Sequence, residues 1–419
     1  MLSKTKIENF LDYIIAICLI LNVHSVWNNT IIRKLNVIFL IISLLIYMFM
    51  SINNLKRKKR EFIKASVITL TVIVYNLLFI TINLSSIGDF ILNFIILYSL
   101  FIYYSIYKRN IGESCYLLLK ISNLIFIISI VSLFFYIFGS VLKVVSANSD
   151  ILLRWGTDRY VSSYHNLYYE TQTINIFGKQ IIRNTGIFTE APMYAFNLCI
   201  SLSVEVFIRK KQKNKKIIVL LFTILTTFST TGIVVSLLII SINLINSRKN
   251  YGLLKKMCLY LFVMILMISS MFFINYKVIQ SKDIYGSYSI RMDDIKVGIE
   301  AWKDNIIMGK GYNRYDLVQQ YMSINDRGND IGGSNGIMKI LPEGGIYLLS
   351  IYIFPLVIAL VYSIKYRVKN VIIFETILVI LLININVPYR FIMIYFLSLG
   401  LSYLFKNDSS KIGENYEKI

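Results

Sequence analysis

The sequence predicts an all-α, polytopic helical membrane protein with about twelve transmembrane helices. Hydrophobic residues make up 56% of the chain and charged residues only 16%, whereas a soluble domain is nearer a quarter charged. Many apolar runs reach roughly 17 residues or more, which is enough to cross roughly 30 Å of hydrocarbon. The mean hydropathy of +0.63 agrees with this class.

The apolar runs set the order of the expected spans. They lie near residues 10–26, 34–52, 62–83, 87–107, 115–138, 190–208, 215–229, 231–246, 254–275, 344–364, 369–386 and 388–405. The first run has no small-residue cleavage site before or after it, so we interpret it as a span rather than a removed signal. The pair 215–246 is interrupted only by STTG (229–232), and also fits two half-helices that meet at the outer interface.

The net charge of +21 raises the question of nucleic acid binding. The basic runs KRKKR (56–60), RKKQKNKK (209–216), SRKNYGLLKK (247–256) and KYRVK (365–369) all lie in short connections between apolar runs. Cytoplasmic loops carry such an excess of lysine and arginine. We therefore expect a lipid bilayer and no nucleic acid as partner, with both termini in the cytoplasm. Only Arg33 and Lys34 fall on the outer side.

Two long connections then lie outside the membrane and divide the chain. The expected parts are helices 1 to 5 (1–138), a first outer loop (139–189), helices 6 to 9 (190–275), a second outer loop (276–343), helices 10 to 12 (344–405) and a cytoplasmic tail (406–419). Both outer loops are rich in aromatic residues, unlike disordered segments. Long ordered loops are usually functional.

The second outer loop is expected to contain an amphipathic helix. In SIRMDDIKVGIEAWKDN, the residues Met292, Ile295, Ile299 and Trp302 are spaced 3, 4 and 3 apart and form one apolar stripe. Such a helix would lie on the outer membrane face or cover the bundle.

RNTGIFTEAP (183–192) places a cation and a carboxylate at the start of a span. Arg183 fits an interfacial anchor that reaches lipid headgroups, or a clamp for phosphate or pyrophosphate, because its guanidinium is a planar fork of donors. Gly186 allows a tight turn. Glu190 fits three roles: an acid in the first turn of a helix, a group that orients Arg183, or a catalytic base.

Other polar candidates lie in the two outer loops. Arg291 begins the amphipathic helix, where free N–H groups also favour anions. Ser334 and Asn335 supply hydrogen-bonding groups in the glycine-rich segment GGSNGIMKILPEGG. His165 fits a base or a sugar ligand, although a lone loop histidine is more often neither. The loop aromatics, Tyr312 and Tyr315 among them, fit either sugar stacking or a membrane-interface belt. The adjacent Asp293 and Asp294 point apart on a helix, and the cysteines are scattered, so we expect no metal and no other cofactor.

In order along the chain, these stretches resemble the superfamily of O-antigen polymerases (Wzy-type) and O-antigen ligases. RNTGIFTEAP resembles the family's Arg-x-x-Gly-x-x-x-Glu-Pro, with Ala191 inserted before Pro192. FSTTG (228–232) resembles a Ser-Arg-Thr turn in which Thr230 replaces the arginine. The segment from Arg291 to Tyr315 resembles an arginine-led helix followed by Asn-Pro-x-x-Gly-x-Gly and an aromatic residue, with Ile306 in place of the proline. GGSNGIMKILPEGGI resembles the family's His/Ser-Asn motif, here with Ser334 in the first position.

The resemblance implies a bacterial inner-membrane glycosyltransferase with a GT-C-like fold, whose active site lies on the outer face. It implies transfer of a glycan from undecaprenyl pyrophosphate to a sugar hydroxyl of another lipid-linked unit. Such enzymes are inverting and need no metal, and a chain-length regulator protein is a typical partner. Arg183, Arg291 and Glu190 would be catalytic. Gly186, Ser334, Asn335, Tyr312, Tyr315 and His165 would contact substrate. The ligase branch carries a histidine where Ser334 stands, which favours a polymerase.

Three alternative functions differ in the sequence features that they require. A ligase would transfer the glycan to a different acceptor. A flippase for lipid-linked oligosaccharides would need charged residues near the membrane midplane and two pseudo-symmetric halves, whereas charge within the spans is sparse (Asp12, Glu205, Glu375). A structural assembly subunit would leave the arrangement of Arg183, Gly186 and Glu190 unexplained.

Overall fold

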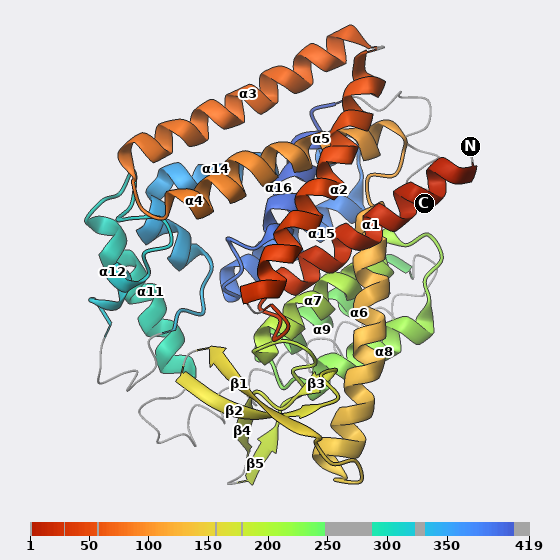
Figure 1. Cartoon of the computed structure of the whole chain (residues 1–419), viewed down its shortest axis with the longest axis vertical. Helices are drawn as coiled ribbons and strands as arrows, with labels where there is room; N and C mark the ends of the chain where they lie inside the picture. Colours follow the sequence, from red (N-terminus) through yellow and green to blue (C-terminus); the bar gives the residue numbers. More distant parts are fainter. Residues whose placement is uncertain are drawn as a thin grey trace.

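The structure is a computed structural model that describes residues 2–28, 30–56, 58–155, 157–176, 179–247, 287–322 and 332–405. The expected span at 254–275, Cys258, the first part of the second outer loop and the tail at 406–419 lie outside these residues. The described residues are mostly helical, with 71% helix. Figure 1 shows a bundle of helices with small sheets at one end.

Helices occupy every expected span that lies within the described residues. They are α1 (Leu2–Asn22), α2 (Thr30–Lys56), α3 (Lys59–Ile82), α4 (Ile87–Phe90) continued by η1 (Ile91–Leu97) and α5 (Tyr98–Asn110), α6 (Tyr116–Phe135) with η2 (Tyr136–Val141), α7 (Ala191–Ser203) with η3 (Val204–Ile208), α8 (Asn214–Thr226), α9 (Thr230–Ser247), α14 (Ile337–Lys365), α15 (Lys369–Asn384) and α16 (Phe391–Ser402). Two further helices, α11 (Ser287–Lys303) and α12 (Asp316–Gln319), lie in the second outer loop.

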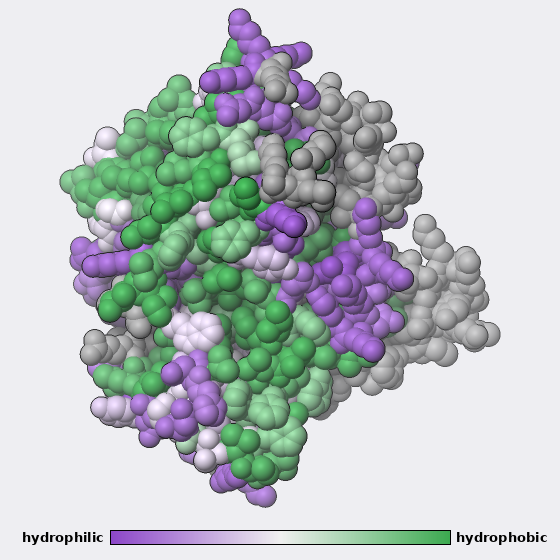
Figure 2. Space-filling model, turned by 45° about the vertical axis from the view of Figure 1, so that its right-hand side comes forward, coloured by the Kyte–Doolittle hydropathy of each residue, from purple (hydrophilic) through white to green (hydrophobic). Residues whose placement is uncertain are grey.

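Among the described residues, six helices are long and apolar enough to cross a membrane. They are α2, α3, the continuous helix Ile87–Asn110, α6 with η2, α7 with η3, and α14. Figure 2 shows hydrophobic side chains over much of one face of the molecule, with hydrophilic side chains gathered in separate patches. These features are those of a helical membrane protein. The number of twelve spans stays a prediction.

The first outer loop corrects the expectation of an all-α fold. It contains a three-stranded antiparallel sheet of β1 (Ser149–Trp155), β2 (Thr157–Tyr164) and β3 (Tyr168–Tyr169), and a hairpin of β4 (Thr173–Ile176) and β5 (Lys179–Ile182). In the first sheet, Leu153 and Val161 are buried while Leu152 and its partner Tyr160 are exposed. Both faces therefore carry apolar side chains, which hides the alternation that predicts a strand.

The centre of the bundle is formed by the helices that are most enclosed. All residues of α16 are buried, and so are nearly all residues of α7. By contrast, α3 buries little of its length and lies along the edge of the bundle (Figure 1). A helix that is apolar on all sides and exposed on most of them suits contact with lipid.

The helix α14 is broken at Gly345, where φ is 61° and ψ is −162°. A Cβ atom there would lie 2.2 Å from the Ile307 carbonyl oxygen, so only glycine fits. The segment 306–311 supplies hydrogen bonds at the break. The amides of Ile346 and Tyr347 donate to the carbonyls of Ile306 and Ile307 at 3.0 Å each. The break is therefore satisfied by a neighbouring segment, as backbone at membrane depth requires.

The expected amphipathic helix is present as α11. It packs on α14, where Gly298 lies against Met338, and on α12, where Val297 and Ala301 form a buried cluster with Val318. Met292, in the predicted apolar stripe, is 49% exposed. The helix thus covers the bundle with its small residues and turns part of its apolar stripe outward.

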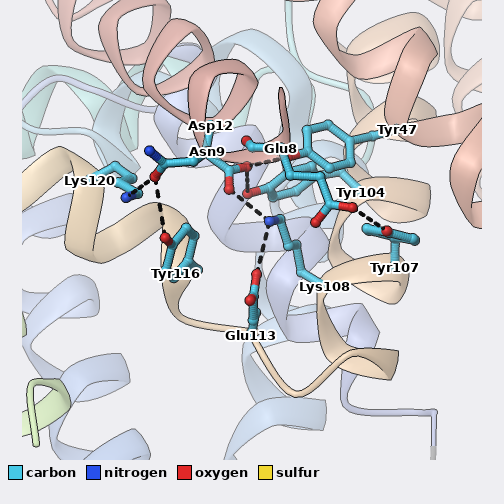
Figure 3. A network of polar contacts seen from close by, with 10 residues as sticks. All are labelled: Glu8, Asn9, Asp12, Tyr47, Tyr104, Tyr107, Lys108, Glu113, Tyr116 and Lys120. Carbon is cyan, nitrogen blue, oxygen red and sulfur yellow. Dashed lines mark hydrogen bonds and ion pairs between the residues drawn. The ribbon is translucent and has the colours of Figure 1, made fainter. Parts of the chain in front are cut away.

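A buried polar network lies at the end of the bundle where α1 begins (Figure 3). The Lys108 ammonium contacts the Asp12 carboxylate at 2.7 Å, and neither side chain is more than 1% exposed. The hydroxyls of Tyr47 and Tyr104 donate to the same carboxylate at 2.8 and 3.0 Å. Asp12, one of the few charges within a span, is therefore paired and joins α1 to α2 and α5.

Lys108→Met is expected to lower the free energy of unfolding by about 3–5 kcal/mol, because it leaves the Asp12 carboxylate buried without a counter-charge. The double variant Asp12→Leu/Lys108→Met should cost less than the single one, since no buried charge remains unpaired. Reversible unfolding in detergent micelles at neutral pH measures both. A double variant less stable than Lys108→Met would contradict the assignment.

Candidate functional site

Several helix ends gather at the other end of the bundle, beside the two small sheets (Figure 1). The turn between α1 and α2 is bonded to the segment before α7: the Val26 amide donates to the Ile187 carbonyl, and the Thr189 amide to the His24 carbonyl, each at 2.9 Å. The amide of Phe391, at the start of α16, donates to Asn22 at 2.8 Å. The segment 183–190 therefore lies among the ends of α1, α2 and α16.

Arg183 follows β5 and is held by the turn between α8 and α9. Its Nε donates to the Thr227 carbonyl at 2.9 Å and its Nη2 to the Phe228 carbonyl at 3.4 Å. The next residue is tied to the same place, because the Asn184 amide donates to the Thr226 carbonyl at 3.0 Å. The guanidinium plane is therefore fixed against this turn, with further N–H donors beyond those that the two carbonyls accept.

Arg291 reaches the same turn from α11. Its Nη1 lies 3.4 Å from the Thr231 hydroxyl oxygen. Burial lowers the pKa of Arg183 to about 10, while the charge of Glu190 opposes this shift and the charge of Arg291 adds to it. Because that pKa lies well above 7, Arg183 stays protonated at neutral pH. Two partly buried guanidinium groups thus contact the segment 227–231, and the charge of Arg291 acts on Arg183.

Glu190 occupies the N-cap position of α7. It has extended backbone angles at the N-cap, and its side chain makes no cap hydrogen bond. Its charge acts on Arg183. The N-cap position fits the first of the three roles open from the sequence, and the action of its charge on Arg183 fits the second.

Gly186 forms the tight turn expected from the sequence, with φ of 56°. Its amide donates to Asn184 Oδ1 at 3.2 Å, and its carbonyl accepts from the Tyr169 amide at 3.1 Å. A Cβ atom there would lie 3.0 Å from the ring of Tyr194. The glycine therefore shapes the loop that carries Arg183.

Ser334 is held by a carboxylate that sequence reasoning did not select. Asp294, one turn after Arg291 on α11, accepts from the Ser334 amide at 2.8 Å and from its hydroxyl at 2.5 Å. Burial lowers the pKa of Arg291, and the charge of Asp294 opposes this shift. Asn335 caps α14 by accepting from the amides of Ile337 and Met338 at 3.0 and 3.1 Å. The carboxylate thus links Arg291 to the glycine-rich segment.

The other predicted residues lie elsewhere. Tyr312 is 1% exposed and accepts a 3.0 Å hydrogen bond from Asn93, so it anchors the loop in the core. Tyr315 packs between α11 and α12, with its hydroxyl beside Gly333. His165 is exposed in the turn after β2, where its amide donates to Asn148 at 2.6 Å. Tyr312 and His165 thus have partners away from the turn that Arg183 contacts, whereas Tyr315 lies beside the segment that carries Ser334.

The fold and this cluster define a helical membrane protein with a cationic site at one end of its bundle. Residues 216–353 match the family model described as O-antigen ligase. The chain therefore carries this domain, consistent with the O-antigen polymerase and ligase superfamily, which confirms the resemblance seen in the motifs. Members of the family are membrane glycosyltransferase-like enzymes of the bacterial inner membrane. No curated protein and no solved structure matched the chain.

The matched range contains the turn 227–231, Arg291, Asp294 and Ser334, whereas Arg183 lies before it. Three of the four motifs therefore belong to the matched domain. The fourth motif, RNTGIFTEAP, contacts the matched domain through the hydrogen bonds from Arg183 to the carbonyls of Thr227 and Phe228. In the described part of the chain, no group of three histidine, cysteine, aspartate or glutamate side chains could hold a metal ion.

Asp294→Ala is expected to lower the free energy of unfolding by about 1.5–3 kcal/mol, because the charge-assisted bonds to the Ser334 amide and hydroxyl are lost. Ser334→Ala should cost less, about 0.5–1.5 kcal/mol, since the amide keeps its partner. Glu300→Ala, at an exposed position on the same helix, is the matched control and should change stability by less than about 0.5 kcal/mol. Thermal unfolding in detergent ranks the three, and equal losses for Asp294→Ala and Glu300→Ala would rule out the link.

Proposed function

We propose that the protein is a polymerase of lipid-linked oligosaccharide repeat units for a surface polysaccharide such as O-antigen or capsule. The observation that carries the proposal is the meeting of Arg183 and Arg291 at the turn 227–231. Two fixed guanidinium groups form a clamp suited to a pyrophosphate, because each offers a planar fork of donors and stays charged.

In the proposed reaction, a hydroxyl oxygen of the acceptor glycan attacks the anomeric carbon of the donor. The bond from that carbon to the undecaprenyl pyrophosphate oxygen breaks, and its electron pair leaves with the pyrophosphate. Stabilising the charge that develops on a leaving group is usually the largest catalytic contribution. Arg183 and Arg291 would supply this stabilisation from groups already fixed in place.

The proton of the acceptor hydroxyl must be transferred to a base. Serine is a poor base unless another group activates it. Ser334 donates its hydroxyl hydrogen to Asp294 at 2.5 Å, so its oxygen can accept a hydrogen bond from the acceptor hydroxyl. As the new glycosidic bond forms, the acceptor proton would pass to Ser334 and the serine proton to Asp294. This pair would act in place of the histidine of the ligase branch.

Further expectations belong to the same proposal. The donor and acceptor are lipid-linked oligosaccharides in a bacterial cytoplasmic membrane, the site faces outward, both termini face the cytoplasm, and a chain-length regulator is a partner. A ligase is the second candidate, because the matching family model is described as O-antigen ligase. The paired state of Asp12 and Glu205 gives no support to a flippase, since both carboxylates already have cationic partners.

Arg183→Gln and Arg291→Gln are each expected to slow glycan transfer by about 10²–10³-fold, because each removes donors from the leaving pyrophosphate. Lys179→Gln removes an exposed cation in β5 and should leave the rate unchanged. The rates are measured with purified protein in liposomes and a synthetic lipid-pyrophosphate oligosaccharide. Thermal unfolding of each variant separates lost catalysis from lost folding, and full rates in both arginine variants would eliminate this site.

The products of the same assay separate the candidate functions. A ladder of polymers on a gel identifies a polymerase. A single transfer to a different acceptor identifies a ligase. Movement of the lipid-linked glycan across the bilayer without a new bond identifies a flippase.

A further inference from the structure

A second group of cations lies at the same end of the bundle as the arginine site. Arg390 is the N-cap residue of α16, and its Nη2 contacts the imidazole of His24, 3.3 Å from Nδ1 and closer to Nε2. Lys339 lies in the first turn of α14, with its ammonium 5.1 Å from the ring centroid of Tyr389. Arg33 begins α2 and pairs with Asp89 at 3.8 Å.

These side chains are neighbours in space: Arg390 contacts His24, and Lys339 lies over the ring of Tyr389, the residue before Arg390. Burial, with the charges of Arg390 and Lys339, lowers the pKa of His24 well below its usual value, so this histidine is neutral at pH 7. Burial lowers the pKa of Arg390 to about 10, and the charge of Arg33 adds to this shift.

The nearby carboxylates do not balance these cations. Asp89 pairs with Arg33, and Glu343 attracts Lys339. The three cations Arg33, Lys339 and Arg390 therefore face two carboxylates, which leaves one positive charge in excess. Neutral His24 adds a ring with one N–H donor and one acceptor. A group of this composition suits an anion.

The position of Arg33 indicates the source of such an anion. Arg33 and Lys34 are the cations that the positive-inside pattern leaves on the outer side. They begin a helix whose next turns expose Leu35, Ile38 and Phe39 by 47%, 50% and 53%. A basic residue at the end of a lipid-facing helix lies at headgroup depth. Arg33, whose side chain is 64% exposed, therefore lies where a ligand from the bilayer would arrive.

The two groups are linked through the segment 185–190. The Thr189 amide donates to the His24 carbonyl, and the next residue, Glu190, acts on Arg183. Their contacts differ: Arg183 and Arg291 contact the segment 227–231, whereas Arg390 contacts His24 and Arg33 contacts Asp89.

We propose that Arg33, Lys339 and Arg390, with neutral His24, bind the pyrophosphate headgroup of a second lipid-linked oligosaccharide, the acceptor. This inference rests on the proposed function, because in polymerisation both substrates carry a lipid pyrophosphate. A ligase whose acceptor carries no lipid pyrophosphate would need only one such site. The Arg183 and Arg291 group then holds the donor, and the second group holds the chain end that accepts it.

Native mass spectrometry of the full-length protein in detergent, with undecaprenyl pyrophosphate as the probe, tests this directly. Wild type is expected to bind two lipids, Arg390→Gln and Arg183→Gln one each, and the double variant none. Lys179→Gln is the matched control and should bind two. Because Arg390 contacts His24, Lys339→Gln and Arg33→Gln are included as variants that leave that contact in place. Each should weaken binding of the second lipid by about tenfold or more.

Binding of one lipid by both wild type and Arg390→Gln would overturn the second site. Equal displacement of the second lipid by phosphatidylglycerol would also overturn it, since the site would then accept any anionic headgroup. Displacement by inorganic pyrophosphate at equal concentration would exclude the lipid as the preferred source. The readout does not depend on turnover: two bound lipids without a polymer ladder would contradict the proposed function and leave the second site standing.

Discussion

The hydrogen bonds from Arg183 to the carbonyls of Thr227 and Phe228 are the interaction on which the polar end of this molecule depends. They join a loop that follows a β-hairpin to a turn between two apolar helices. The carbonyls at a helix end have no partner within their own helix, and a guanidinium is well suited to supply donors there. Once the turn 227–231 is fixed, Arg291 can reach it from α11, and Asp294 can hold Ser334 one turn further along.

The two ends of the bundle treat charge in opposite ways. At one end Asp12, Lys108, Tyr47 and Tyr104 form a closed network, in which the carboxylate has a cation and hydroxyl donors within 3.0 Å (Figure 3). At the other end, the charge of Arg291 adds to the lowering of the Arg183 pKa, and the charge of Glu190 opposes it. A buried network with matched partners stabilises a fold, whereas cations whose pKa values are shifted by burial and by a like charge are a feature of functional sites.

Much of the architecture could be predicted from sequence, because spans in a membrane are set by length and hydropathy. The helix over 287–303 could also be predicted, from the spacing of its apolar residues. The small sheets could not be predicted, since Leu152 and Tyr160 place apolar side chains on the exposed face and hide the alternation. For the candidate site, Arg183, Arg291 and Ser334 could be selected because their residue types suit an anion, and their roles stay predictions. The contact of Asp294 with Ser334 could not be predicted, because it joins residues 40 positions apart and no local pattern records it. The burial of Tyr312 could not be predicted either, since an aromatic residue in a loop can equally be exposed or buried.

The break in α14 at Gly345 has a consequence for how the site responds to its membrane. The residues before it, from Ser334 to Glu343, carry the polar groups, while the residues after it form the lipid-facing span. A continuous helix would transmit any tilt imposed by a thicker or thinner bilayer directly to its first turn. Here the segment 306–311 is bonded to both sides of the break: the amides of Lys310 and Gly311 donate to the carbonyls of Pro342 and Glu343, and the amides of Ile346 and Tyr347 donate to the carbonyls of Ile306 and Ile307. The response of the polar site to bilayer thickness therefore depends on this segment as well as on the helix.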